Sequence, residues 1–164
     1  AAGAPAVRRL GRADMPAVER HLLALGPADR RKRFLLPADD AAIGAFVARL
    51  DPGRAVVVGA MAPDGPAVGV AEARPVAGMA RGTVEVAVSV HPYHRREGIG
   101  RRLVARAVSI AFAEGADAAV LLFAPENRAM ARLADALGAR STALGGALLV
   151  EATLDRRGGA ALAA

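Results

Sequence analysis

One stretch of the chain decides its fold: VSVHPYHRREGIGRRL, residues 88–103. An apolar strand pattern ends at Val90, a short basic turn with two glycines follows, and an amphipathic helix is predicted to begin near Gly98. The first N–H groups of a helix have no partner within the helix, and the helix dipole favours an anion there. The stretch therefore predicts a strand–turn–helix that binds phosphate.

The turn carries the pattern Arg-x-x-Gly-x-Gly at Arg95, Gly98 and Gly100. Glycine has no Cβ, so a diphosphate can approach this backbone closely. Together with Arg95, Arg96 and Arg101 add positive charge at the rim. The spacing differs from the P-loop and from Gly-x-Gly-x-x-Gly. A glycine-rich helix start without a ligand is equally typical of these six residues alone, but the preceding strand and the following basic helix favour binding.

This region resembles the acyl-CoA-binding motif of the GNAT superfamily, the acetyl-CoA-dependent N-acetyltransferases. The resemblance continues through a strand-like run at 118–123, then Asn127 with a second helix, and then Leu137-Gly138. Specific motifs extend over about residues 84–139. The resemblance implies an acyltransferase that moves an acetyl group from acetyl-CoA, its cosubstrate, to a primary amine by direct attack. The amine would belong to a small molecule or to a protein lysine or N-terminus.

The implied fold is the GNAT-type α/β (α+β) fold, a mixed, mostly antiparallel sheet of six to seven strands flanked by helices. A single domain is expected over residues 6–154, with a flexible tail over 155–164. The periodicity and the turn residues predict the elements in order. Strands are expected at 7–10, 55–61, 67–76, 83–90 and 118–123, a hairpin at 141–154, and helices from Asp14 to Gly26 and at 27–33, 39–50, 98–114 and 127–137.

The resemblance also implies which residues hold the cosubstrate. Backbone N–H groups of residues 96–101 would bind the diphosphate, and the pantetheine arm would run beside residues 88–90 like an added strand. A backbone N–H near Val88 would face the acetyl oxygen. Asn127 would contact the cosubstrate, cap its helix, or do both. The expected binding residues are Val88, Ser89, Val90, Arg95, Arg96, Glu97, Gly98, Ile99, Gly100, Arg101 and Asn127.

Glu85 is the expected general base. Alternation along residues 83–90 places Glu85, Ala87 and Ser89 on one face of the strand and the valines on the other. A carboxylate beside the cosubstrate can take a proton from the amine, directly or through a water, and many GNAT members have a Glu on this strand. An outward Glu85 paired with Arg74 across the hairpin is the alternative, and Glu72 is a competing base.

The expected general acid is missing. Many family members have a Tyr seven residues after the Asn, but Ala134 occupies that position here. The only tyrosine, Tyr93, lies in the predicted phosphate turn. This difference leaves open a second function, that of an acyl-CoA-binding regulatory module without catalysis.

The amino-acid composition limits which other classes of function the chain can have. A chain of 164 residues is typical of one domain. The net charge of +6 favours anionic partners, and coenzyme A satisfies that preference. A nucleic-acid-binding domain is the third alternative, supported only by the charge and by the basic cluster 30–33, which is predicted to be a solvated helix face. An aromatic content of 3% argues against a stacking surface for single strands.

The absence of cysteine excludes disulfides, thiolate zinc sites and a cysteine nucleophile. The three histidines are scattered, so no metal site is expected. No apolar run is long enough to cross a membrane, and the expected location is cytoplasmic. A homodimer through exposed strand edges is an expectation at the level of the fold. The acceptor pocket is expected at about residues 20–50, and nothing there identifies the amine.

Overall fold

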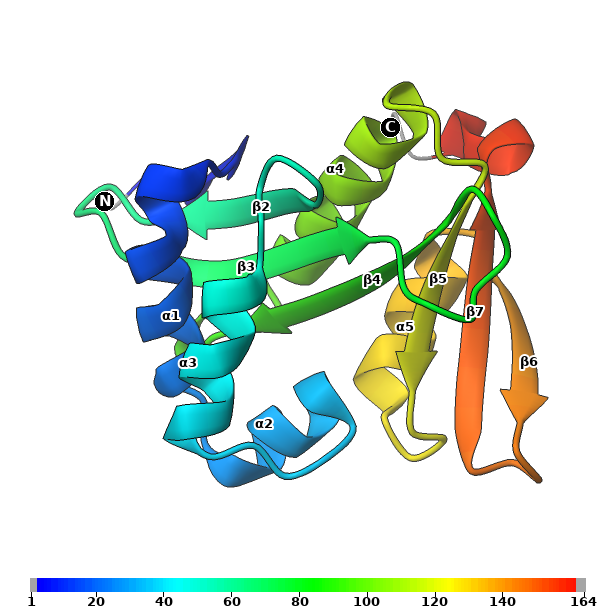
Figure 1. Ribbon diagram of the computed structural model, residues 1–164, viewed down its shortest axis with the longest axis horizontal. Coiled ribbons are helices and arrows are strands. Elements are labelled where there is room, and N and C mark those ends of the chain that lie inside the picture. Colours follow the sequence, from blue (N-terminus) through cyan, green and yellow to red (C-terminus); the bar gives the residue numbers. More distant parts are fainter. Residues whose placement is uncertain (1–2, 162–164) are drawn as a thin grey trace.

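The computed structural model describes residues 3–161, and the chain forms a seven-stranded mixed sheet with helices on both faces (Figure 1). The strand order is β1-β2-β3-β4-β5-β7-β6. Every neighbouring pair is antiparallel except β4 and β5, which run parallel. The predicted fold class is confirmed. The strands are β1 (Ala6–Arg9), β2 (Val56–Met61), β3 (Ala67–Arg74), β4 (Thr83–Val90), β5 (Ala118–Phe123), β6 (Arg140–Leu144) and β7 (Leu149–Asp155).

Helices cover the two faces of the sheet with separate cores. On one face α1 and α3 pack on β2 and β3, and on the other face α4 and α5 pack behind the sheet (Figure 1). The helices are α1 (Met15–Leu23), α2 (Pro27–Phe34), α3 (Asp40–Arg49), α4 (Ile99–Ala113) and α5 (Arg128–Ala136), with 3-10 turns at Arg12–Asp14, Pro92–His94 and Arg156–Ala161. None of the helices within residues 3–161 has the length and apolar character that a membrane crossing requires.

The parallel pairing of β4 with β5 is short. Only residues 83–85 of β4 pair with residues 118–120 of β5. Beyond Glu85 the two strands part, since β5 continues beside β7 while β4 keeps only β3 as a strand partner. Residues 86–90 of β4 therefore present a free backbone edge to the space between the two strands.

Alternation along β4 divides its side chains as the sequence predicts. Val84 and Val86 are buried in the core beneath α4, and Val88 and Val90 pack against that core. Ser89 points to the opposite face, where it contacts His21 of α1. The two faces of β4 therefore separate the hydrophobic support from the side available for chemistry.

Two local features differ from expectation. The first helix ends at Leu23, and Gly26 instead caps α2, because Pro27 occupies the first turn of α2. Residues 155–161, assigned to a tail by sequence, contain the last residue of β7 and a 3-10 turn in which Arg156 pairs with Asp117 at 2.9 Å. Residues 162–164 lie outside the described residues.

Leu103 fixes the distance between α4 and the sheet. Its side chain is fully buried, and a Cβ added at Gly69 of β3 would lie 2.8 Å from its Cδ1 atom. The absence of a side chain at Gly69 thus allows the close approach of α4 to β3.

Truncation of this contact is expected to be costly. Leu103→Ala removes fully buried methyl groups and leaves a cavity, so the free energy of unfolding should fall by about 2–5 kcal/mol. Urea unfolding measures the change. Ser109→Ala, on the exposed side of the same helix, should change it by no more than about 0.5 kcal/mol. Equal effects of the two substitutions would contradict the packing described here.

Candidate functional site

A cavity of about 600 Å³ opens where β4 parts from β5. Its wall comes from the free segment of β4, the turn that leads into α4, the first part of α5 and one side of α2. Ten of the eleven residues predicted to bind the cosubstrate line it, and the exception is Glu97. Those on the wall are Val88, Ser89, Val90, Arg95, Arg96, Gly98, Ile99, Gly100, Arg101 and Asn127.

The N-terminus of α4 closes one end of the cavity. Its first backbone hydrogen bond runs from the N–H of Arg102 to the carbonyl of Gly98, 3.1 Å, so the N–H groups of residues 99–101 have no partner within the helix. Gly98 is left-handed, with φ of 72°, and a Cβ there would meet no atom within 4 Å. The helix start therefore combines free donors with open space, which suits an anion.

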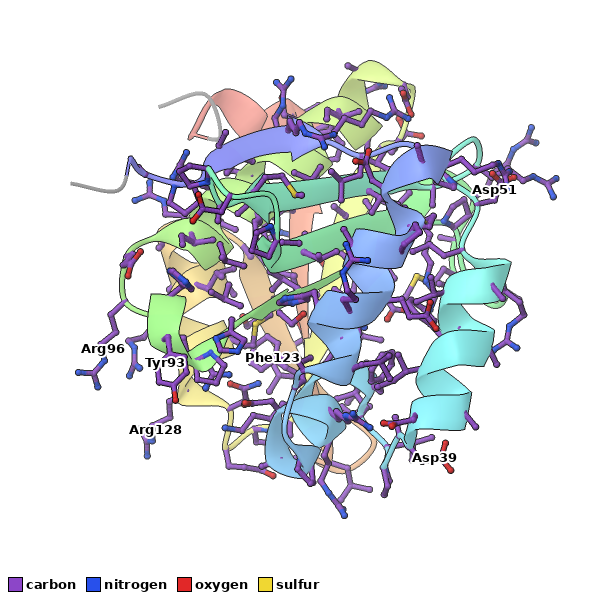
Figure 2. All side chains as sticks on the ribbon, turned by 90° about the vertical axis from the view of Figure 1, so that its left-hand side faces the viewer. Asp39, Asp51, Tyr93, Arg96, Phe123 and Arg128 are labelled. Carbon is purple, nitrogen blue, oxygen red and sulfur yellow. The ribbon has the colours of Figure 1, made fainter. Side chains whose placement is uncertain are left out.

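Positive charge surrounds this helix start. Lys32, Arg96, Arg101 and Arg132 line the cavity, and Arg96 projects from the turn at the edge of the molecule (Figure 2). The carboxylate on the wall, that of Asp29, is neutralised by the guanidinium of Arg95 at 2.8 Å. The donors of the helix and the cations of the wall together fit a ligand with several negative charges.

Arg95 has a structural contact as well as its place on the wall. Its Nε donates to the carbonyl of Val90 at 3.2 Å while its guanidinium pairs with Asp29 of α2. The first residue of the glycine pattern thus ties the turn to both β4 and α2.

Asn127 caps α5 and borders the cavity at the same time. Its Oδ1 accepts the N–H of Met130 at 3.3 Å, and the residue is 9% exposed. Among the described residues its amide nitrogen has no hydrogen-bond partner. Both of the roles expected for Asn127 are therefore compatible with its position.

The two carboxylates considered as bases differ in their surroundings. Glu72 of β3 is 1% exposed and forms a buried ion pair with Arg33 of α2, so its charge is already engaged. Glu85 is half-buried and lies opposite Arg74 in the β3–β4 register, but within residues 3–161 no ion pair to Glu85 is found. Glu85 is the last residue of β4 that pairs with β5, and it lies outside the cavity wall.

Neither Ala134 nor Tyr93 brings a tyrosine to the cavity wall. Ala134 is fully buried in the core beneath the sheet and does not reach the cavity. Tyr93 is 87% exposed and projects from the turn into solvent (Figure 2). Within residues 3–161 no phenol therefore lines the cavity.

The basic cluster 30–33 is partly structural, which corrects the prediction of a solvated face. The side chain of Arg33 is 5% exposed because it pairs with Glu72. Arg30 is 14% exposed, and it donates to the carbonyls of Leu25 and Leu23 at 2.8 and 2.7 Å. Half of the cluster thus anchors α2 to its surroundings.

The sequence interpretation missed His21 of α1. This residue is 3% exposed, and its Nε2 lies 2.9 Å from the Oγ of Ser89 on the cavity wall. Burial lowers the pKa of His21 from 6.5 to about 4. Hydrogen bonds to the peptide groups of Ala67 and Ser89 oppose this shift, and electrostatic interactions with His91 and Arg33 add to it. The imidazole is therefore neutral at pH 7.

The helical periodicity of the sequence already indicates that His21 is buried. It falls on the same face as the buried Val18, Leu22 and Leu25. That period shows that His21 is buried, whereas its contact with Ser89 depends on the docking of α1 on β4.

The neutral state of His21 predicts a pH dependence of stability. Because its pKa is depressed in the folded state, unfolding takes up a proton at acidic pH, and stability is lost as the pH falls from about 6.5 to 4. The loss should reach about 3 kcal/mol. Urea unfolding at pH 7 and pH 4 should show a smaller loss for His21→Gln than for the unaltered chain. Identical losses in both proteins would contradict a buried neutral imidazole.

Comparison with solved structures finds the same fold. The GNAT domain of S. lividans PAT has 18% identity and a TM-score of 0.75, covering 91% of this chain and 89% of that one. YncA from Salmonella typhimurium, a putative acetyltransferase with its cofactor acetyl-CoA, has 24% identity and a TM-score of 0.70, covering 92% and 93%. Spermidine N-acetyltransferase from Vibrio cholerae, in complex with CoA and spermine, has 16% identity and a TM-score of 0.70, covering 93% and 95%.

No curated protein matches the chain. A family model does match, that of the acetyltransferase (GNAT) family, over residues 20–139. This segment spans most of the chain and contains every residue of the cavity wall. The chain therefore belongs to the acetyltransferase (GNAT) family.

Proposed function

We propose that this chain is an N-acetyltransferase that moves the acetyl group of acetyl-CoA to a primary amine of a small molecule, a protein lysine or a protein N-terminus. The observation that carries the proposal is the cavity in which the free edge of β4 ends at the unpartnered N–H groups of α4. The family supports the acetyltransferase chemistry. Of the acceptor only the reacting group, an amine, is proposed.

Acetyl-CoA fits the residues of the cavity. In the proposal its diphosphate is bound by the N–H groups of residues 96–101 and by the neighbouring arginines. Its pantetheine arm carries amide groups, which can bond to the free N–H and C=O groups along residues 86–90 as an added strand would. Asn127 contacts the arm from the start of α5.

The thioester of acetyl-CoA supplies an activated acyl group. The chain supplies the groups that polarise the thioester carbonyl and deprotonate the amine. A backbone N–H near Val88 donates to the carbonyl oxygen as negative charge develops on it. Glu85 accepts the proton of the amine. Because Glu85 lies just outside the cavity wall, the proton reaches it through a water.

A second function is favoured by one observation. No tyrosine lines the cavity in the described part of the chain, which suits a module that binds acyl-CoA and transfers nothing. Turnover of a panel of primary amines separates the two functions. Acetylation of any of them eliminates the regulatory module, and tight binding without turnover favours it.

Gly98→Glu tests the anion site. The new carboxylate would lie where a diphosphate binds and repel it, so binding of acetyl-CoA should fall at least about 100-fold. Isothermal titration calorimetry measures the change, with dephospho-CoA and ATP as comparison ligands. Gly138→Glu is the matched control, because Gly138 has a φ of 75° and a Cβ there also meets no atom within 4 Å, but it lies away from the cavity. Near-normal affinity in Gly98→Glu would sink the anion site.

Glu85→Gln tests the base. Removing the carboxylate should lower kcat by about 100-fold while the Kd for acetyl-CoA stays within about twofold, since proton transfer by a positioned base contributes about that much. The control is Glu151→Gln on β7, outside the cavity. An unchanged rate at every pH would exclude Glu85 as the base.

A further inference from the structure

Three residues of α2 reach the cavity from one face of the helix. Asp29, Lys32 and Arg33 have the spacing i, i+3 and i+4, and all three line the wall. Asp29 pairs with Arg95 of the turn before α4, so this part of α2 lies at the phosphate end of the cavity. Arg33 lies about 6 Å further along the helix axis than Asp29. The face of α2 therefore runs away from the phosphate end.

The far end of this face lies beside the middle of β4. Arg33 pairs with Glu72 of β3, and Glu72 lies opposite Ala87 in the β3–β4 register. Ala87 lines the cavity and precedes Val88, where the proposed function places the carbonyl of the thioester. Lys32 is the neighbour of Arg33 in the helix. It therefore lies on the side of the cavity from which an acceptor reaches the thioester.

Lys32 carries the uncompensated charge of this face. It is exposed, and within residues 3–161 no acidic side chain forms an ion pair with it. The charge of Arg33 is balanced by Glu72, although the Nε atom of Arg33 is buried and has no hydrogen-bond partner among the described residues. The carboxylate of Asp29 is balanced by Arg95. One net positive charge and one unpartnered donor therefore remain on the α2 side of the cavity.

We propose that the acceptor is an amino acid whose carboxylate binds to Lys32 on the α2 side of the cavity. The inference rests on the proposed function and narrows its acceptor from any primary amine to a small molecule that carries a carboxylate. The single negative charge of a carboxylate matches the single uncompensated cation. The ammonium group of Lys32 donates to one carboxylate oxygen, and the second oxygen has lone pairs left for the Nε–H of Arg33.

The same wall disfavours a polyamine. A second ammonium group on the acceptor needs a free carboxylate, and the acid that lines the cavity within residues 3–161, Asp29, is already paired. The lysine and arginine side chains of the wall are Lys32, Arg33, Arg95, Arg96, Arg101 and Arg132. A polyamine therefore meets charges of its own sign, which weakens its binding.

The common amino acids, each compared with its own α-carboxamide, test the proposal. The two members of a pair have nearly the same size and differ in one charge. The amine of the carboxamide loses its proton more readily, so a faster reaction of the acid does not come from easier deprotonation. For the best acceptor of the panel, kcat/KM of the acid should exceed that of the carboxamide by about tenfold or more. Spermidine, the polyamine of the panel, should be a poor acceptor.

Substitution of Lys32 should remove this preference. In Lys32→Ala the ratio of kcat/KM between acid and carboxamide should fall about tenfold, while the Kd for acetyl-CoA stays within about twofold. Lys32→Arg keeps the charge and should keep the preference, whereas Lys32→Glu should reverse it in favour of the carboxamide. Arg31→Ala is the matched control, because Arg31 is the exposed neighbour on the same helix and does not line the cavity.

Ionic strength supplies a second readout. Salt screens the charge of an exposed side chain. The preference for the acid should therefore weaken as salt is raised in the unaltered chain, and it should be insensitive to salt in Lys32→Ala. A preference that is equally sensitive in both proteins would overturn the assignment to Lys32.

The outcomes separate this inference from the proposed function. Carboxamides or spermidine acetylated as fast as the amino acids, or acetylation restricted to lysine-containing peptides and protein N-termini, overturn the inference and leave the N-acetyltransferase standing. Weaker binding of acetyl-CoA in Lys32→Ala with an unchanged preference for the acid assigns Lys32 to the cosubstrate and also overturns the inference. Failure of the unaltered chain to bind acetyl-CoA, or to acetylate any of these amines, overturns both.

Discussion

The site depends on the parting of β4 and β5 after three paired residues. Beyond that point β5 stays paired with β7 along residues 118–123, while β4 stays paired with β3, and the two strands diverge. The free backbone groups of β4 that result need other partners. The connection from β4 to β5 is a parallel crossover through α4, so this helix must begin at the end of β4, beside the gap. The free strand edge and the helix N-terminus therefore lie next to each other at the same place in the fold.

Polar contacts hold α2, which forms the opposite wall of the cavity. None of the residues of α2 is fully buried, and its main apolar contact is that of Phe34 with the core and with Phe46. In addition Arg30 donates to the carbonyl of Leu25, Arg33 pairs with Glu72 inside the fold, and Asp29 pairs with Arg95. A buried ion pair adds little net stability, because desolvation offsets the attraction, but removal of one partner leaves an uncompensated charge. These pairs set the place of α2 relative to β4 and the phosphate turn.

The walls of the site differ in how well the sequence predicted them, because they come from different parts of the chain. Residues 88–101 are one continuous segment, and local rules for strands, turns and helix starts were enough to place them. The wall from α2 and the contact of His21 with Ser89 both join segments that are far apart in the sequence. His21 and Ser89 are 68 residues apart. Helical periodicity shows that His21 is buried but not what it faces. The burial of Arg33 likewise depends on Glu72 of another element, so a charge run alone predicted a solvated face.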